Sequence, residues 1–149
     1  MRLLTLNAVL AIHRRQMAEH GGEAGLRDIG LLESALSRPL NLISYSEPDI
    51  AHLAAAYAFG IAKNHPFIDG NKRTAFVAMR TFLILNNSDI NASQQDKYET
   101  IMSLADGSLS ESGLAEWIRQ KTEVEVRRWK LEMEDVDGDK NLALDLADS

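Results

Sequence analysis

Apolar residues recur at helical spacing along almost the whole of this chain, and that periodicity limits the folds it can adopt. Over residues 6–17 they stand three and four positions apart, and Gly21-Gly22 then provides a stop signal. Residues 46–49 combine a hydroxyl, an early proline and a carboxylate, which is typical of a helix start. Ser93 and Ser110 mark two later starts. The pattern predicts an all-α bundle of about six helices.

One predicted helix differs from the others because it is apolar on nearly every side. This is the segment 74–85, and such a pattern describes a helix buried in the middle of a bundle. A shorter helix is expected over 28–37, where Pro39 should end it because proline lacks an amide hydrogen and clashes with the preceding turn. Residues 40–46 are then too few and too mixed for a helix, and we expect a short extended flap there.

The distribution of charge divides the chain into a body and a tail. At 149 residues and 45% hydrophobic, the chain is long enough for one domain with its own core, which we place at residues 1–122. Residues 123–149 carry nine acidic and four basic side chains, and we expect this acidic C-terminal tail to be partly disordered. The body holds twelve basic and thirteen acidic residues. Because nucleic-acid affinity rests on many phosphate contacts, no direct nucleic-acid partner is expected.

Cysteine usage and hydropathy restrict the compartment. The chain has no cysteine, which excludes a disulfide framework and a thiolate metal site. No stretch approaches the roughly 18 to 20 apolar residues of a membrane span, so no membrane association is expected. These features predict a cytoplasmic protein.

The polar residues suited to chemistry gather in one nine-residue motif between two helical segments. The motif is His65-Pro66-Phe67-Ile68-Asp69-Gly70-Asn71-Lys72-Arg73. A loop that feeds a helix N-terminus directs unpaired backbone amides and the positive end of the helix dipole at one point, which makes an anion site. Gly70 allows the backbone to approach an anion closely, and Lys72 and Arg73 add charge that suits phosphate. The motif therefore predicts a polyphosphate ligand.

The remaining residues of the motif fit transfer chemistry on such a ligand. Asp69 is its only carboxylate, and Mg²⁺ typically takes one or two carboxylates plus phosphate oxygens. Histidine, here His65, is the side chain best suited to take a proton from an alcohol near neutral pH. Phe67 is expected to enter the core and anchor the loop, and Pro66 to stiffen it. Together they predict nucleotide-dependent transfer to a hydroxyl.

Each of these residues also has an ordinary structural interpretation. A histidine before a proline often caps a helix, Lys72-Arg73 suits a solvated first turn, and Asp69 to Asn71 is a common turn composition. Their conjunction within nine residues favours a functional site. The other histidines lack such neighbours, so we assign His13, His20 and His52 structural positions, with His13 on an apolar helix face.

The motif resembles the signature of the Fic/Doc family, H-[PX]-F-x-[DE]-[GA]-N-[GK]-R. Residues 31–39 and 54–64 are similar to the death-on-curing branch of that family, and the resemblance covers about residues 1–122. It implies an all-α bundle that moves part of a nucleotide onto a protein hydroxyl. The resemblance also implies roles, namely general base for His65, magnesium ligand for Asp69, and phosphate-binding loop for Gly70, Asn71 and Arg73.

One position separates the branches of the family. Most Fic proteins have a second glycine there and transfer AMP, whereas this chain has Lys72, as death-on-curing toxins do. The resemblance to those toxins implies that ATP binds in the reversed sense and loses its terminal phosphate. A lysine fills space and adds charge where glycine leaves room. Gly70 follows the general Fic pattern, so protein AMP transfer is kept as an alternative.

The resemblance further implies biological partners. A death-on-curing toxin phosphorylates a threonine of elongation factor Tu and so inhibits translation. Many Fic proteins inhibit themselves through a pattern [ST]-x-x-x-E-[GN]; the nearest match here, residues 112–117, fails at Trp117. We therefore expect a separate antitoxin as inhibitor, and residues 40–45 as the target-docking flap. A catalytically silent module that only binds the antitoxin is the alternative from another class.

Overall fold

The computed structural model describes residues 1–122, which form six helices and no strand. The helices are α1 (Leu6–His20), α2 (Ile29–Tyr45), α3 (Ile50–Asn64), α4 (Asn71–Leu85), α5 (Gln94–Asp106) and a last helix over 111–122. The predicted all-α bundle of about six helices is confirmed. None of these helices is long and apolar enough to cross a membrane. The predicted acidic tail, residues 123–149, lies outside the described part of the chain.

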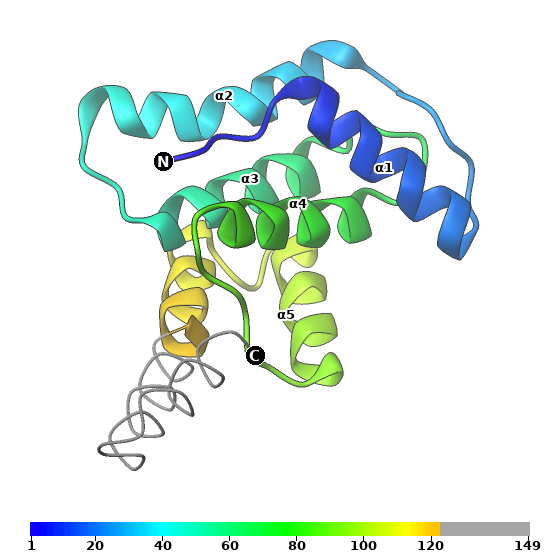
Figure 1. Cartoon of the computed structure of the whole chain (residues 1–149). Helices are drawn as coiled ribbons and strands as arrows, with labels where there is room; N and C mark the ends of the chain where they lie inside the picture. The colour runs from blue at the N-terminus through cyan, green and yellow to red at the C-terminus, as the bar shows by residue number, and fades with distance from the viewer. Residues whose placement is uncertain (123–149) are drawn as a thin grey trace, which may run out of the picture.

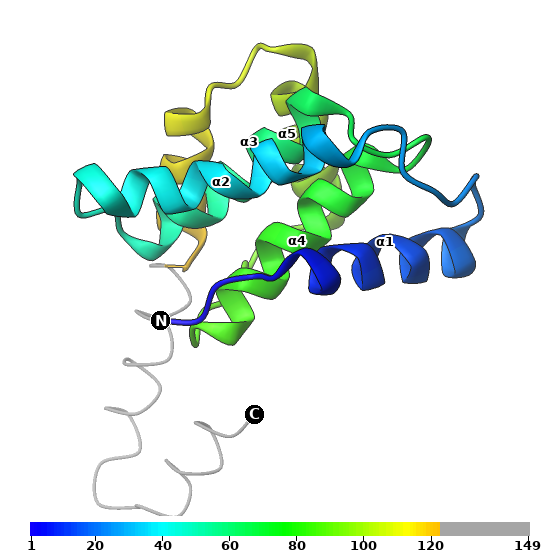
Figure 2. The same cartoon turned by 90° about the horizontal axis from the view of Figure 1, so that it is seen from above.

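The helices lie in three layers around a central pair (Figure 1). Helices α3 and α4 run side by side in the middle, with α1 and α2 on one side and α5 and the helix 111–122 on the other (Figures 1 and 2). Helix α4 buries six residues, as expected for the segment 74–85. Helix α3 is more enclosed, with ten of its fifteen residues buried. The centre of the bundle is therefore the pair, with α3 the more deeply covered member.

Small side chains explain why α3 can occupy this position. Six alanines and Gly60 are among its buried residues, and small residues let neighbouring helices approach closely. A Cβ added to Gly60 would lie 2.9 Å from the Cα of Ala35 in α2, so the two backbones are in direct contact there. Tyr57 is the large residue among these small ones. Its ring is buried, and its hydroxyl accepts a hydrogen bond from the Leu4 amide at 3.0 Å.

Helix α2 continues through Pro39 to Tyr45, so the expected stop at Pro39 and the flap over 40–46 are wrong. An interior proline costs roughly 3 kcal/mol in helix propensity. Leu32, Ala35 and Pro39 are all buried on the face that contacts α3, and burying one leucine side chain alone contributes about 1.5–3 kcal/mol. Packing on α3 thus outweighs the local cost, because propensity is only a weak preference.

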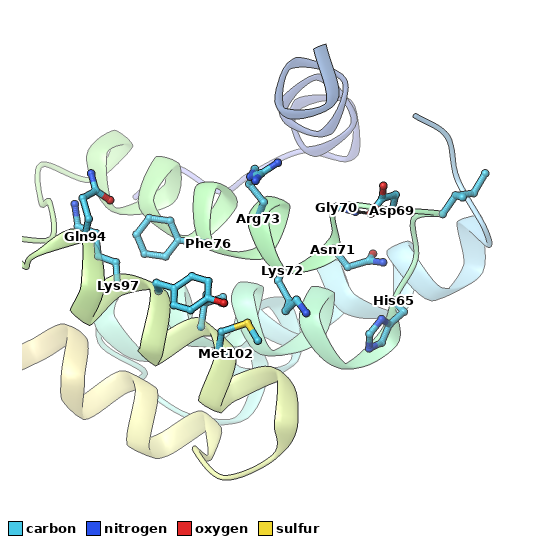
Figure 3. Close-up of a pocket in the computed structure, with 13 residues that line it drawn as sticks. His65, Asp69, Gly70, Asn71, Lys72, Arg73, Phe76, Gln94, Lys97 and Met102 are labelled. Atoms are coloured by element: carbon cyan, nitrogen blue, oxygen red, sulfur yellow. Dashed lines mark hydrogen bonds between the residues drawn. The ribbon is translucent and has the colours of Figure 1, made fainter. Parts of the chain in front are cut away.

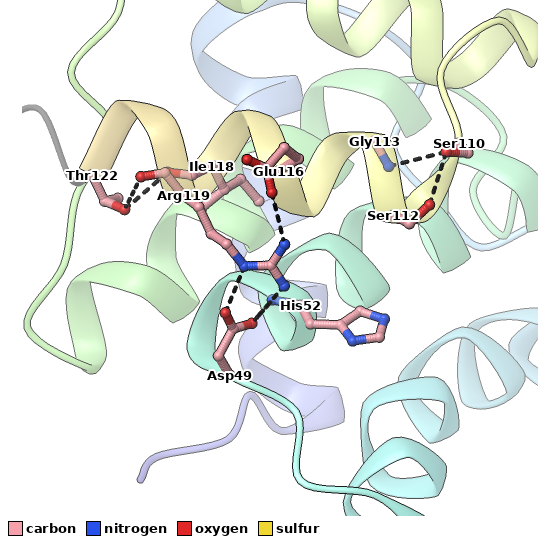
Figure 4. Close-up of polar contacts among 9 residues, drawn as sticks. All are labelled: Asp49, His52, Ser110, Ser112, Gly113, Glu116, Ile118, Arg119 and Thr122. Atoms are coloured by element: carbon pink, nitrogen blue, oxygen red, sulfur yellow. Dashed lines mark hydrogen bonds and ion pairs between the residues drawn. The ribbon is translucent and has the colours of Figure 1, made fainter.

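The start of α3 also differs from its expected capping. Ser46 ends α2 as its C-cap, and the N-cap of α3 is Asp49, whose carboxylate accepts the His52 amide at 2.8 Å. Arg119 of the last helix donates two hydrogen bonds to the same carboxylate, at 2.6 and 3.1 Å (Figure 4). The bond from Arg119 holds the pKa of Asp49 below its ordinary value. This pair ties the helix 111–122 to the beginning of α3.

We expect Gly60→Ala to lower the free energy of unfolding by about 1–3 kcal/mol, because overpacking forces backbones apart. The new Cβ would meet the backbone of Ala35 at 2.9–3.0 Å, and backbone cannot swing aside. Gly113→Ala is the matched control, since its Cβ would meet mainly the flexible end of Leu109. Urea denaturation of both variants measures the difference. Equal losses in the two variants would contradict close contact between α2 and α3.

Candidate active site

The nine-residue motif forms a short loop with a left-handed residue at each end. Helix α3 ends at His65, whose φ is 48° and ψ 56°, and α4 begins after Gly70, whose φ is 75°. Asn71 closes the loop, because its side-chain oxygen accepts from the Phe67 amide at 2.9 Å and its side-chain nitrogen donates to the Phe67 carbonyl at 3.0 Å. The side-chain oxygen and nitrogen of Asn71 therefore both help to shape the loop. Its expected contact with phosphate stays a prediction.

Phe67 anchors the loop in the core, as expected. It is only 1% exposed and its ring stacks on His13 of α1, with ring centroids 3.8 Å apart. His13 is buried as well, and its Nδ1 lies 3.2 Å from the Thr74 hydroxyl of α4. Burial lowers the pKa of His13, against the opposing influence of Asp69. The structural position assigned to His13 is confirmed, and it supports the loop from beneath.

The segment between α1 and α2 lies along the motif loop and was not expected from the sequence to take part in the site. Leu26 forms an isolated antiparallel bridge with Phe67. The amides of Arg27 and Asp28 both donate to the Pro66 carbonyl, at 2.8 and 3.1 Å. In the other direction, the Ile68 amide donates a hydrogen bond to the Gly25 carbonyl at 3.1 Å. Backbone pairing thus fixes the path of the loop.

Arg27 adds a side-chain contact that acts directly on His65. Its Nε donates to the His65 carbonyl at 2.7 Å, and its Nη2 donates to the Asn64 carbonyl at 2.8 Å. The last carbonyls of a helix have no partner within the helix, so this guanidinium satisfies two of them. A left-handed backbone is unfavourable for a residue with a Cβ, and Arg27 holds His65 in it. No local pattern around residue 27 signals this role.

Asp69 is exposed beside the start of α4, with its carboxylate held by two backbone amides. Its Oδ1 accepts from Gly70 at 2.8 Å and its Oδ2 from Glu23 at 3.3 Å. Among the described residues, no three carboxylate, histidine or cysteine side chains lie close enough to form a metal site. Asp69 is the only carboxylate within residues 1–122 that lines the adjoining pocket. That donor set fits Mg²⁺ when phosphate oxygens and water complete its coordination.

A pocket of about 570 Å³ lies between the motif, the first turns of α4 and one face of α5. Its volume is within the roughly 300–1,000 Å³ typical of small-molecule sites. All expected site residues except the buried Phe67 line it. The wall contributed by the rest of α4 and by α5 was not predicted, and it consists of Phe76, Gln94, Lys97, Tyr98, Ile101 and Met102.

The lining residues are arranged in a definite order (Figure 3). His65 and Asp69 lie at one end, and Lys72 and Arg73 leave the first turn of α4 in different directions next to them. Phe76 follows one turn further along α4, and the α5 side chains run from Met102, next to Lys72, to Gln94 and Lys97 at the end away from His65. The pocket therefore has a polar end at the motif, a middle section with Phe76, and Gln94 and Lys97 at the far end.

The charge at the pocket is strongly positive. Lys72, Arg73 and Lys97 line it, and none of their side chains makes a hydrogen bond or ion pair within residues 1–122. Asp69 is the only carboxylate on the same wall. Lys72 and Arg73, in the first turn of α4, lie where an anion with several charges is attracted by both the cations and the helix N-terminus. This agrees with the polyphosphate ligand predicted from the motif.

The near-match to a self-inhibitory pattern lies away from this pocket. Glu116 is in the helix 111–122, its side chain is 60% exposed, and it pairs with Arg119 at 3.2 Å. Arg119 in turn binds Asp49 at the beginning of α3, whereas the motif follows the end of α3 (Figure 4). A 15-residue helix is about 22 Å long, so Glu116 does not reach the motif.

Comparisons with known proteins agree with the geometry. A model of the Fic/DOC family matches residues 3–83. "Toxin Doc" of Mycolicibacterium smegmatis is 40% identical over 85 residues, which are 55% of this chain and 65% of that protein. "Protein kinase doc" of Escherichia phage P1 is 30% identical over 121 residues, which are 80% of this chain and 95% of that protein. The match thus spans 65% of the first relative's length and nearly all of the second's.

We expect Arg27→Met to disturb His65 without unfolding the protein. Losing two charge-assisted hydrogen bonds should lower the free energy of unfolding by about 1–2 kcal/mol. The amide resonance of His65 in a nitrogen–proton correlation spectrum should shift or broaden, because its left-handed backbone is no longer held. Arg14→Met, on the exposed face of α1, is the control. A His65 resonance that is the same in both variants would show that Arg27 does not hold it.

Proposed function

The chain belongs to the Fic/DOC family, and on that basis we propose that it is a toxin that transfers the terminal phosphate of ATP to a hydroxyl group of another protein. Residues 1–122 form the proposed Fic/Doc domain. The names of its relatives, "Toxin Doc" and "Protein kinase doc", are compatible with both parts of this proposal. The observation that supports it best is the order of polar and apolar residues along the pocket.

That order favours one direction for a bound nucleotide. A base and ribose suit the section with Phe76 and the α5 wall, and phosphates suit the free cations and amides at the start of α4. The terminal phosphate is then the group nearest His65. Transfer of AMP would instead need the α-phosphate at His65, with the nucleoside beyond it. Phe76 lies on the side of Lys72 and Arg73 that faces away from His65 (Figure 3).

Gly70 has a structural explanation that does not depend on the transferred group. A Cβ at this position would lie 2.1 Å from the Cε of Met17, and the φ of 75° is one that residues with a Cβ rarely adopt. The positive φ of the turn therefore favours glycine here whichever group is transferred. The glycine no longer favours AMP transfer, and Lys72 becomes the position that bears on the choice.

The chain's residues supply the parts of an in-line phosphate transfer. His65 accepts the proton of the attacking hydroxyl, whose oxygen forms a bond to the γ-phosphorus while the bond to the β,γ-bridging oxygen breaks and ADP leaves. Lys72, Arg73 and the amides of the first turn of α4 stabilise the negative charge that moves onto the leaving oxygen. A Mg²⁺ ion held by Asp69 would neutralise phosphate charge. Phe67 and Asn71 keep these groups in place.

The proposal includes two protein partners. A threonine of elongation factor Tu is the proposed acceptor, so that modification stops translation. A separate antitoxin is the proposed inhibitor, since the only near-match to an inhibitory pattern within residues 1–122 holds its glutamate against Arg119, far from the pocket. A silent antitoxin-binding module would have no need for the free cations and the exposed histidine of this pocket.

Labelled ATP distinguishes the possible products. With elongation factor Tu as acceptor, we expect label to be retained from the γ position and not from the α position. His65→Ala should reduce transfer by about 100-fold or more, the contribution typical of general base catalysis. The same variant should abolish growth inhibition in cells that lack the antitoxin. Label retained only from the α position would refute phosphate transfer, and unchanged growth inhibition would favour the silent module.

We expect Lys72→Gly to lose phosphate transfer by about tenfold or more, because the lysine charge contributes to placing the phosphates. The space that it leaves should let AMP transfer become measurable. Lys72→Ala is the matched control, since it removes the charge without adding backbone freedom. Transfer of γ- and α-label by the three proteins measures both activities. Undiminished γ-transfer in Lys72→Gly would show that this residue does not set the direction of the nucleotide.

A further inference from the structure

One face of α5 forms a pocket wall that lies outside the motif and beyond the residues matched by the family model. The family model ends at residue 83, before this helix begins. The lining residues of α5 recur at the spacing of a single helical face, and they are Gln94, Lys97, Tyr98, Ile101 and Met102. Such a stripe is ordinarily buried in the core. Here only Ile101 is buried, and Tyr98 is 64% exposed, so the stripe faces the pocket.

Two aromatic side chains give this section the chemistry of a base-binding site. Phe76 of α4 and Tyr98 of α5 both line it, and neither makes a ring contact with another aromatic side chain within residues 1–122. Stacking of a nucleobase on such a ring stabilises binding whichever base it is, because every base has a π-face. The aromatics therefore explain retention of a base but not its identity.

Gln94 supplies a group able to distinguish one base from another. Its neighbour Gln95 donates a hydrogen bond to Glu99 at 3.0 Å, whereas the Gln94 amide makes no hydrogen bond within the described residues. Figure 3 shows Gln94 beside Lys97 at the end of the pocket away from His65. A carboxamide can accept from the amino group of adenine and donate to its ring nitrogen at the same time.

From this arrangement we infer that α5 binds the nucleoside and that Gln94 selects adenine over guanine. The inference rests on the proposed function for the direction of the nucleotide, and it adds the residue that determines which nucleotide is used. On the N7 edge, guanine offers two acceptors, one of which would face the carboxamide oxygen without a hydrogen between them. Gln94 is thus a specificity-determining residue, distinct from the motif residues that handle phosphate.

The test compares Gln94→Leu with Gln95→Leu in the full-length chain. Wild type should bind Mg-ATP more tightly than Mg-GTP in calorimetry. A bidentate base contact is worth 1–3 kcal/mol, so the ratio of the two dissociation constants should fall about tenfold in Gln94→Leu. It should stay unchanged in Gln95→Leu, whose side chain faces Glu99. A ratio unaltered by Gln94→Leu would overturn the assignment, as would a wild type that binds neither nucleotide.

A second pair of variants checks the stacking platform. Tyr98→Phe should retain ATP affinity, and Tyr98→Ala should lose roughly five- to tenfold, because only the second removes the ring. Equal ATP affinities for wild type and both variants would show that Tyr98 does not contact the nucleoside. Binding separates this inference from the proposed function. A chain that binds ATP selectively through Gln94 but transfers no label would leave the inference standing and refute phosphate transfer.

Discussion

The contact between the backbones of α2 and α3 at Ala35 and Gly60 determines how the rest of the molecule is arranged. Because α3 carries small side chains, it can lie between α2 and α4 and touch α5 as well. Its two ends then become fixed points in the fold. The N-terminal end holds the last helix through Asp49 and Arg119, and the C-terminal end presents His65. The pocket takes its position from this central helix.

Patterns that depend on neighbours in the chain were predictable from the sequence. The helical periodicity correctly located most elements, and Ser93 caps α5 as expected by accepting the Asp96 amide. Pro39 was misleading because its local cost is plain in the sequence, while the burial of Leu32 and Ala35 that offsets it depends on α3. The motif residues lie together in one loop, since they are consecutive and the loop is closed by Asn71.

What could not be predicted depends on residues distant in the sequence. Arg27 lies 38 positions before His65, and only the folded chain brings its guanidinium to that carbonyl. The α5 wall is similar, because nothing in the amphipathic pattern of Gln94 to Met102 distinguishes a face that lines a pocket from one that packs in a core. Gly70 is a third example. Its closeness to Met17 is a structural reason for the glycine, whereas a comparison of motifs alone would attribute this residue to catalysis.

The pairing of residues 25–28 with the motif loop determines whether this site could be transferred to another protein. The nine residues of the motif do not hold their own shape, because the backbone of a separate connection and a ring on α1 complete it. Grafting the motif between two helices of another bundle would transfer its side chains without their directions. A working graft would need three pieces of chain, taken from α1, the connection to α2 and the α3–α4 loop. Sequence searches with the motif alone will therefore also find chains that have the residues and lack the site.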